Sequence, residues 1–239
     1  MQAQADEDDL YHCAFNFPAV LSVLGPQAWP DLRHTHETLC KDKRVRIRQT
    51  LAYSLHEIAK LCGEAETLID KFELFAHSKQ VDVKEGVVQY LPEFIATLKN
   101  KPDFLLKNEK LITQKEKSWR NRSQQGLNLV SLAEVLEPKE FQKYIPVLLE
   151  FCQDEVSEVR LEVCRQMYRA VQACLRESAV GIAMVSQICE MATATRYTSR
   201  QDFVAICESV IKHKIELFDD YFAKAFYELQ HDKYLDVKI

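Results

Sequence analysis

Hydrophobic and polar positions along the chain repeat with a long, regular period. A cationic residue follows a turn in each copy, and in most copies a β-branched residue precedes it. These cationic landmarks are Arg48, Lys84, Arg122, Arg160, Arg200 and Lys238. Successive landmarks are 36, 38, 38, 40 and 38 residues apart. A fixed period of roughly 20–50 residues is typical of arrays built from one repeated supersecondary unit.

The residues after each landmark follow the spacing of an α-helix, because positions three, four and seven further on share one helix face. The third positions are Leu51, Val87, Gln125, Val163 and Phe203. The fourth are Ala52, Val88, Gly126, Cys164 and Val204, and the seventh are Leu55, Leu91, Leu129, Met167 and Cys207. The small fourth residues are expected to let neighbouring helices approach closely. Gln125 is the polar exception on this apolar face.

A second amphipathic stretch precedes each turn. These stretches cover residues 27–40, 64–77, 102–115, 138–152, 178–193 and 217–230. Six residues before four of the landmarks stands an acid that can cap a helix start, and these acids are Asp42, Glu116, Asp154 and Asp232. The pattern therefore predicts that each repeat consists of a first helix (helix A), a short turn and a second helix (helix B).

The period and the helix–turn–helix unit predict an all-α fold, a HEAT-repeat α-α superhelix (solenoid) of about five to six repeats. Residues 144–164 resemble the HEAT consensus, with Pro146 expected to bend helix A. Residues 1–9 read as an acidic polar segment, and residues 10–239 as a single solenoid. Neither end of the sequence looks capped, so we expect part of a longer array.

Composition and charge narrow the range of possible functions and cellular locations. The formal net charge is −5 and the isoelectric point about 5.9, which argues against a general nucleic-acid binder. The 8 cysteines form no C-x-x-C pair and are expected to be buried thiols in a reducing compartment. No stretch approaches the run of about 18 apolar residues that a membrane span needs. The polar, acidic beginning does not resemble a signal peptide, so we expect the cytoplasm or the nucleus.

Candidate chemistry is sparse. The sequence lacks a phosphate-binding glycine loop and the G-x-S-x-G and H-E-x-x-H motifs, so we expect no enzymatic activity and no cofactor. His36 and Cys40 share a helix face, but two ligands fall short of a zinc site and His34 points away. We therefore expect no metal.

Two blocks in the first third of the sequence carry a more specific resemblance. Residues 12–29 (HCAFNFPAVLSVLGPQAW) and 45–63 (VRIRQTLAYSLHEIAKLCG) resemble the HEAT-repeat regulatory subunits of protein phosphatase 4, which are similar to the scaffold subunit of protein phosphatase 2A. The resemblance covers about residues 12–100, and beyond it only the general HEAT pattern is recognisable. It implies a non-catalytic scaffold that binds a serine/threonine phosphatase catalytic subunit and directs it to substrates.

In such families partners dock on the edge formed by the turns between helices A and B. Carried onto this sequence, those turns are residues 41–48, 78–84, 115–122, 153–160 and 195–200. The candidate partner-binding residues are Lys43, Arg44, Arg46, Lys79, Lys117, Trp119, Arg120, Asp154, Glu155 and Glu158. Arg and Trp are favoured anchors of protein interfaces, and the turns vary in charge, with the first and third basic and the fourth acidic.

A purely structural interpretation competes with docking for the landmark arginines Arg48, Arg122, Arg160 and Arg200. We expect each of them to pair with an acid of its own or the next repeat. For Lys43, Arg44, Arg46 and Arg120, docking and simple solvation stay equally open.

Other functions also remain open from the sequence. The alternatives are another HEAT adaptor, such as a transport receptor or a cytoskeletal or ciliary component, and a HEAT-like DNA glycosylase, which the acidic isoelectric point disfavours. The partners we expect are proteins, with no nucleic acid, membrane or small-molecule substrate.

Overall fold

The computed structural model describes residues 2–235 and 237, and the landmark Lys238 lies outside them. The chain divides into two compact units, residues 1–105 and 106–239. Within residues 2–235 all regular secondary structure is helical, which confirms the predicted all-α class. The predicted segment 1–9 is helical from Gln2 and continuous with the first helix. The prediction of one solenoid over residues 10–239 stays a prediction.

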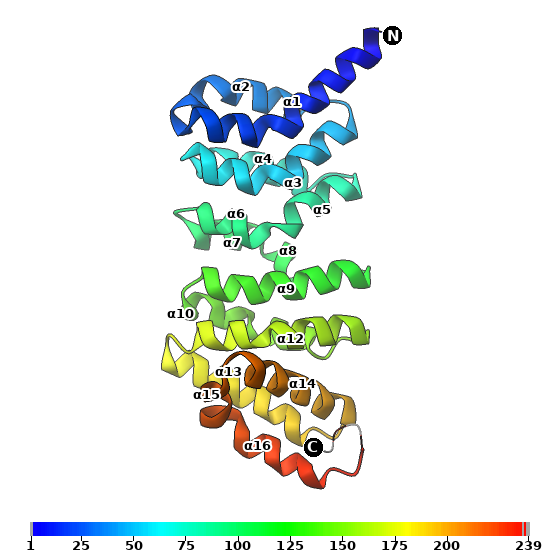
Figure 1. Cartoon of the computed structure of the whole chain (residues 1–239), viewed down its shortest axis with the longest axis vertical. Helices are drawn as coiled ribbons and strands as arrows, with labels where there is room; N and C mark the ends of the chain where they lie inside the picture. Colours follow the sequence, from blue (N-terminus) through cyan, green and yellow to red (C-terminus); the bar gives the residue numbers. More distant parts are fainter. Residues whose placement is uncertain (1, 236, 238–239) are drawn as a thin grey trace. The chain divides into compact units, whose positions relative to one another are not determined.

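The first unit is a stack of helices around α3, drawn from blue to cyan-green in Figure 1. Its elements are α1 Gln2–Leu24, α2 Trp29–Cys40, α3 Val45–Cys62, α4 Ile69–Ala76, α5 Val81–Gln89 and α6 Leu91–Thr97. Helix α3 packs against α1 and also against α5 and α6. The rings of Phe72, Phe94 and Phe104 lie with centroids 4.9–5.6 Å apart and form an aromatic part of the core. Helix α7 Lys101–Lys107 crosses the boundary between the units.

The second unit repeats this arrangement around α12. Its elements are α8 Glu109–Thr113, α9 Trp119–Val135, α10 Pro138–Phe141, α11 Ile145–Phe151, α12 Ser157–Cys174, α13 Ser178–Glu190, α14 Tyr197–His213, α15 Ile215–Leu217 and α16 Ala223–Glu228. Helix α12 packs against both α9 and α14, and α9 and α12 run side by side in Figure 1.

Helices A and B stand where the sequence predicts them. The B helices are α3, α5 with α6, α9, α12 and α14, and each begins three residues before its landmark. All residues at the third and seventh positions after the landmarks are buried. Of the fourth positions, Ala52, Gly126 and Cys164 are buried, whereas Val88 and Val204 are half-buried.

Gly126 shows why one of these positions needs a very small residue. A Cβ added to it would lie 2.4 Å from Cγ2 of Val163 and 3.4 Å from the side chain of Phe151. The prediction that small residues allow close approach is thus confirmed where α9 meets α12.

Several helices are divided where the sequence suggested one continuous helix. Short 3₁₀ turns at Pro26–Ala28 and Ala65–Leu68 precede α2 and α4, and a third at Gln142–Tyr144 separates α10 from α11. Pro146 stands in the first turn of α11, so it begins a helical segment where we predicted a bend within one. Pro92 likewise stands in the first turn of α6, which separates α6 from α5 in the second B helix.

Candidate functional site

The landmark arginines close the turns between helices A and B. In each case Nη1 donates to the carbonyl oxygens six and five residues earlier. For Arg122 these are Glu116 and Lys117, at 3.4 and 2.9 Å. Arg48, Arg160 and Arg200 repeat the same two bonds at 2.5–3.3 Å. Carbonyls near a helix end lack intrahelical donors. The arginine at the fourth position of helix B satisfies two turn carbonyls and so fixes the path of the chain into that helix.

Three of these arginines also pair with a carboxylate of the next repeat. Nε and Nη2 of Arg122 lie 2.9 and 3.0 Å from the two oxygens of Asp154. Arg200 binds Asp232 in the same two-point manner at 2.5 and 3.2 Å. Nε of Arg160 lies 3.1 Å from Asp202. The predicted pairing is confirmed for these three residues, which we call the arginine ladder.

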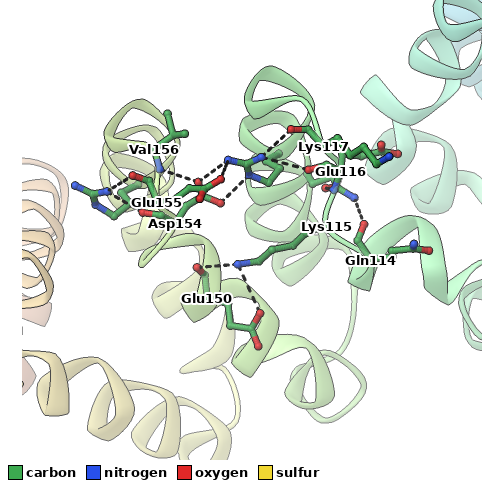
Figure 2. Close-up of polar contacts among 11 residues, drawn as sticks. Gln114, Lys115, Glu116, Lys117, Glu150, Asp154, Glu155 and Val156 are labelled. Carbon is green, nitrogen blue, oxygen red and sulfur yellow. Dashed lines mark hydrogen bonds and ion pairs between the residues drawn. The ribbon is translucent and has the colours of Figure 1, made fainter.

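Asp154, which we predicted as a partner-binding residue, is buried against Arg122 of the arginine ladder. It is only 4% exposed, and it also accepts a bond from the Val156 amide at 3.0 Å. Burial by itself raises the pKa of its carboxyl, but the bonds from Arg122 and Val156 outweigh burial and leave that pKa below its usual value. The neighbouring Glu155, whose side chain is 83% exposed, accepts a bond from Nη2 of Arg122 at 3.2 Å. Figure 2 shows both acids beside the preceding turn.

The first turn carries three of the predicted basic residues in three different situations. Lys43 is exposed. Arg44 binds both oxygens of Asp42, at 2.8 and 2.7 Å, and this pairing is the main reason that the pKa of Asp42 falls to about 2. The guanidinium of Arg46 lies 3.7 Å from the ring centre of Tyr11 on α1. Lys43 and Arg46 therefore present positive charge, whereas Arg44 is largely neutralised.

The turn at residues 114–118 presents an exposed aromatic–cation pair. The guanidinium of Arg120 lies 4.5 Å from the Trp119 ring, which is 38% exposed at the start of α9. Lys117 is exposed beside them. Nζ of Lys115 instead contacts the backbone oxygen and the carboxylate of Glu150, at 3.3 and 3.6 Å (Figure 2). The remaining predicted residues, Lys79 and Glu158, are exposed at their own turns.

Gln125, the polar exception on the apolar face, has a clear role in the structure. It is 4% exposed, and its amide oxygen accepts from the Glu116 backbone N–H at 3.0 Å. Its amide nitrogen donates to the carbonyls of Leu111 and Gln114, at 3.2 and 3.0 Å. One buried side chain thus satisfies three backbone groups around the end of α8. Sequence spacing gave no signal for this role.

His36 and Cys40 pack in the core of the first unit. The imidazole nitrogens lie 3.7 and 3.6 Å from Sγ of Cys40, and His36 contacts the rings of Phe17 and Trp29. Complete burial lowers the pKa of His36 to about 4, so the ring is neutral at physiological pH. Over the described part of the chain, no three His, Cys, Asp or Glu residues gather as metal ligands. No helix formed by these residues is both long and apolar enough to cross a bilayer.

Comparisons with known proteins agree with the resemblance seen in the sequence. Residues 13–105 match the family model described as the protein phosphatase 4 regulatory subunit 1 middle domain. Serine/threonine-protein phosphatase 4 regulatory subunit 1 of Homo sapiens is 31% identical over 217 residues, which is 87% of this chain and 23% of that protein. Regulatory subunit 4 of Homo sapiens is 29% identical over 103 residues, 42% of this chain and 12% of that protein.

These matches extend further than the two blocks at residues 12–29 and 45–63. The alignment with regulatory subunit 1 takes in most of the second unit, where the sequence alone suggested only the general repeat. The chain spans less than a quarter of the length of that relative. Among solved structures, an engineered protein covers 85% of this chain with a TM-score of 0.46 and 14% identity.

Proposed function

The chain is related to the regulatory subunits of protein phosphatase 4, and from this relationship we propose that it is a non-catalytic scaffold. In this proposal it holds a serine/threonine phosphatase catalytic subunit, of type 4 or similar to type 2A, and directs it to substrates. The supporting observation is the 31% identity to regulatory subunit 1 over 87% of the chain. The name of that relative describes a subunit that regulates a phosphatase, and a helical repeat with exposed turns suits such a role.

The turns offer the contact surface that this proposal requires. The arginine ladder, Asp154 and Arg44 are taken up by internal bonds, so the side chains left for a partner are Lys43, Arg46, Lys79, Lys117, Trp119, Arg120, Glu155 and Glu158. Turn side chains vary without disturbing the packed helix faces, so binding chemistry can accumulate there at little structural cost. Trp119 with Arg120 is the strongest anchor, since Trp and Arg dominate measured interface energies.

The test is surface plasmon resonance with purified protein phosphatase 4 catalytic subunit. We expect the double reversal Lys117→Glu with Arg120→Glu to slow association about 10-fold at low salt and to flatten its salt dependence, because charge steers encounter. The matched control reverses Lys139 and Lys224, which lie on helices α10 and α16 of the same unit, away from these turns.

Melting temperatures should be equal for both double variants, because all four side chains are exposed. Equal loss of binding in the control, or wild-type binding by the Lys117 and Arg120 variant, would refute docking at this turn. Failure of the wild-type chain to bind the catalytic subunit would refute the phosphatase assignment itself. The proposed location is the cytoplasm or the nucleus, where such phosphatase partners would be reached, and imaging of the tagged full-length protein tests it.

A further inference from the structure

A wide groove crosses the first unit over helices α1, α3 and α6. It has a volume of about 1560 Å³ and is lined by α1, α3, α6 and the segments that follow α3 and α6. On α1 the lining residues are Tyr11, Phe15, Pro18, Ala19 and Ser22, whose spacing places them on one helix face. The groove shares Arg46 with the first turn but is otherwise separate from the turn residues.

Aromatic rings form the middle of this groove. The rings of His56 and Tyr90 are stacked, with centroids 4.1 Å apart and planes 18° from parallel. Tyr53 meets Tyr90 edge-on at 6.5 Å. All three residues line the groove and come from α3 and from the residue that precedes α6. Tyr53 and Tyr90 line the open groove, and the electron-rich face of a tyrosine ring attracts a cation.

Two carboxylates flank these rings. Glu57 and Glu93 line the groove, and both are exposed. Glu57 lies 4.0 Å from Nε2 of His56, and among the described residues neither Glu57 nor Glu93 forms an ion pair with a lysine or arginine. Burial lowers the pKa of His56, more than the nearby carboxylates raise it, so this ring is mostly neutral at pH 7. The middle of the groove therefore carries negative charge that no lysine or arginine of the unit neutralises at contact distance.

The basic residues of the groove lie at its ends. Arg46 stands at the start of α3, with its guanidinium 3.7 Å from the Tyr11 ring centre. Lys60 stands in the last turn of α3, and Lys99 follows α6, where its backbone N–H donates to Glu66 at 2.6 Å. The Arg46–Tyr11 contact shows that rings on this face accept a guanidinium. Arg46 thus supplies positive charge at the start of α3, whereas Lys60 and Lys99 share the other end of the groove with the carboxylate of Glu66, which also lines it.

We propose that this groove binds an extended peptide segment of a partner protein through a basic side chain. An arginine or lysine of the peptide lies against Tyr53 and Tyr90, and its charge pairs with Glu57 and Glu93. Neighbouring aliphatic side chains of the peptide pack on Phe15 and Pro18. The site goes beyond the proposed docking of a phosphatase at the turns, because it supplies a second surface with a different chemical preference.

The dimensions suit an extended segment. The two basic residues of α3, Arg46 and Lys60, are 14 positions apart, which corresponds to about 21 Å at about 1.5 Å per residue. An extended chain advances about 3.3 Å per residue, so this distance corresponds to a contact of about six residues. Main-chain amides of such a segment meet hydroxyl and amide side chains on α3, namely Gln49, Thr50 and Ser54. The carboxylates of Glu57 and Glu93 then set the position of the peptide's basic residue along the groove.

Fluorescence anisotropy with short synthetic peptides tests the proposal on the full chain. The probe is a labelled nine-residue peptide with a central arginine between leucine and proline residues. Its matched versions carry lysine, citrulline or glutamate at the centre. Citrulline keeps the shape of arginine without its charge. We expect the arginine and lysine peptides to bind, the citrulline peptide to bind about 10-fold more weakly, and the glutamate peptide not to bind.

Variants of the chain separate the groove from other surfaces. Glu57→Gln with Glu93→Gln should weaken the arginine peptide about 10-fold. The same change at Glu162 and Glu208, exposed on helices of the second unit, should leave its affinity unchanged. Tyr53→Phe keeps the ring and should bind nearly as the wild type does, whereas Tyr53→Leu should lose binding at an unchanged melting temperature. Binding of the phosphatase catalytic subunit serves as a separate readout, which the two glutamine changes in the groove should not alter.

Several results would overturn the proposal. Equal affinity of the arginine and citrulline peptides would mean that charge plays no part. Tighter binding of the glutamate peptide would mean that Arg46, Lys60 and Lys99 dominate the groove. Absence of saturable binding of the arginine and lysine peptides up to about 1 mM would also refute it, since that limit corresponds to only about 4 kcal/mol.

Discussion

Replacement of Arg122 by alanine tests whether the arginine ladder holds the repeats together. The arginine side chain is 9% exposed and that of Asp154 only 3%, so the substitution leaves a buried carboxylate with one remaining donor, the Val156 amide. Breaking a buried ion pair from one side typically destabilises a protein by about 3–5 kcal/mol. The carbonyls of Glu116 and Lys117 lose their donor as well, but they lie in a turn that water can reach.

The loss of stability in Arg122→Ala depends on pH, because the unpaired Asp154 can take up a proton. Protonation of a carboxyl with the ordinary pKa of 3.8 requires a free energy of about 4 kcal/mol at pH 7, since each pH unit above the pKa corresponds to about 1.4 kcal/mol. Protonation therefore limits the penalty on the unpaired Asp154 to about 4 kcal/mol at pH 7 and to about 2 kcal/mol at pH 5. The wild type keeps its stabilisation over this range, because the pKa of its Asp154 is lowered.

Urea denaturation followed by tryptophan fluorescence measures the effect. The chain has 2 tryptophans, Trp29 in the first unit and Trp119 in the second, so a Trp29→Phe background makes the signal specific to the second unit. With a slope of about 2–3 kcal/mol per molar urea, we expect the midpoint to fall by roughly 1.5 M at pH 7 and by about half that at pH 5.

Two further variants make this measurement decisive. Lys139→Ala removes an exposed contact with Glu177 and should change stability by less than about 0.5 kcal/mol. The pair Arg122→Met with Asp154→Leu should be more stable than Arg122→Ala, because no buried charge is left. A loss below about 1 kcal/mol in Arg122→Ala, or the same loss at pH 7 and pH 5, would refute the reasoning.

Four other substitutions probe the same unit. Gly126→Ala should lower the melting temperature despite better helix propensity, because its Cβ would lie 2.4 Å from Val163, and Val163→Ala in the same chain should restore part of the loss. Val163→Asp should unfold the unit far more readily than Glu162→Ala in thermal melts, since Val163 is fully buried and Glu162 exposed; equal shifts would mean that the helix faces are assigned wrongly. In urea titrations against pH, Asp154→Asn should destabilise the unit at pH 7. A lowered pKa gives stability that is present above the ordinary pKa of about 4 and is lost as the pH falls through the lowered pKa of the folded state. Asp202→Asn should be neutral or stabilising at pH 7, because burial raises the pKa of Asp202, so that stability is lost as the pH rises through this pKa; a clear loss of stability in Asp202→Asn would contradict this sign.

The sequence determined the repeat and the helix positions, and it predicted that the landmark arginines pair with acids. A 38-residue period and the three, four and seven spacing are local properties of a helix that buries one face, so they can be read without knowing which helices meet. Gly126 was predicted for the same reason, as a small residue on a packed face. Four of the B helices have an arginine at the fourth position, and the structure added that this arginine also donates to two carbonyls five and six residues earlier in the chain.

Tertiary structure decided which groups meet between repeats. The sequence has an acid six residues before most landmarks, and in the structure Asp154 and Asp232 at such positions pair with the arginine of the preceding repeat. The corresponding position for Arg160 is 194, which is an alanine. Asp202 from the next B helix supplies the carboxylate instead. Asp154 was predicted at a docking surface and is buried by Arg122, while Gln125 satisfies a turn that its position on the apolar face did not reveal. The groove combines residues from α1, α3 and α6, whose side chains come together only when the B helices pack. Helix periodicity fixes the face on which a residue lies, whereas its partners depend on the spacing and rotation of neighbouring helices, which the packed side chains set together.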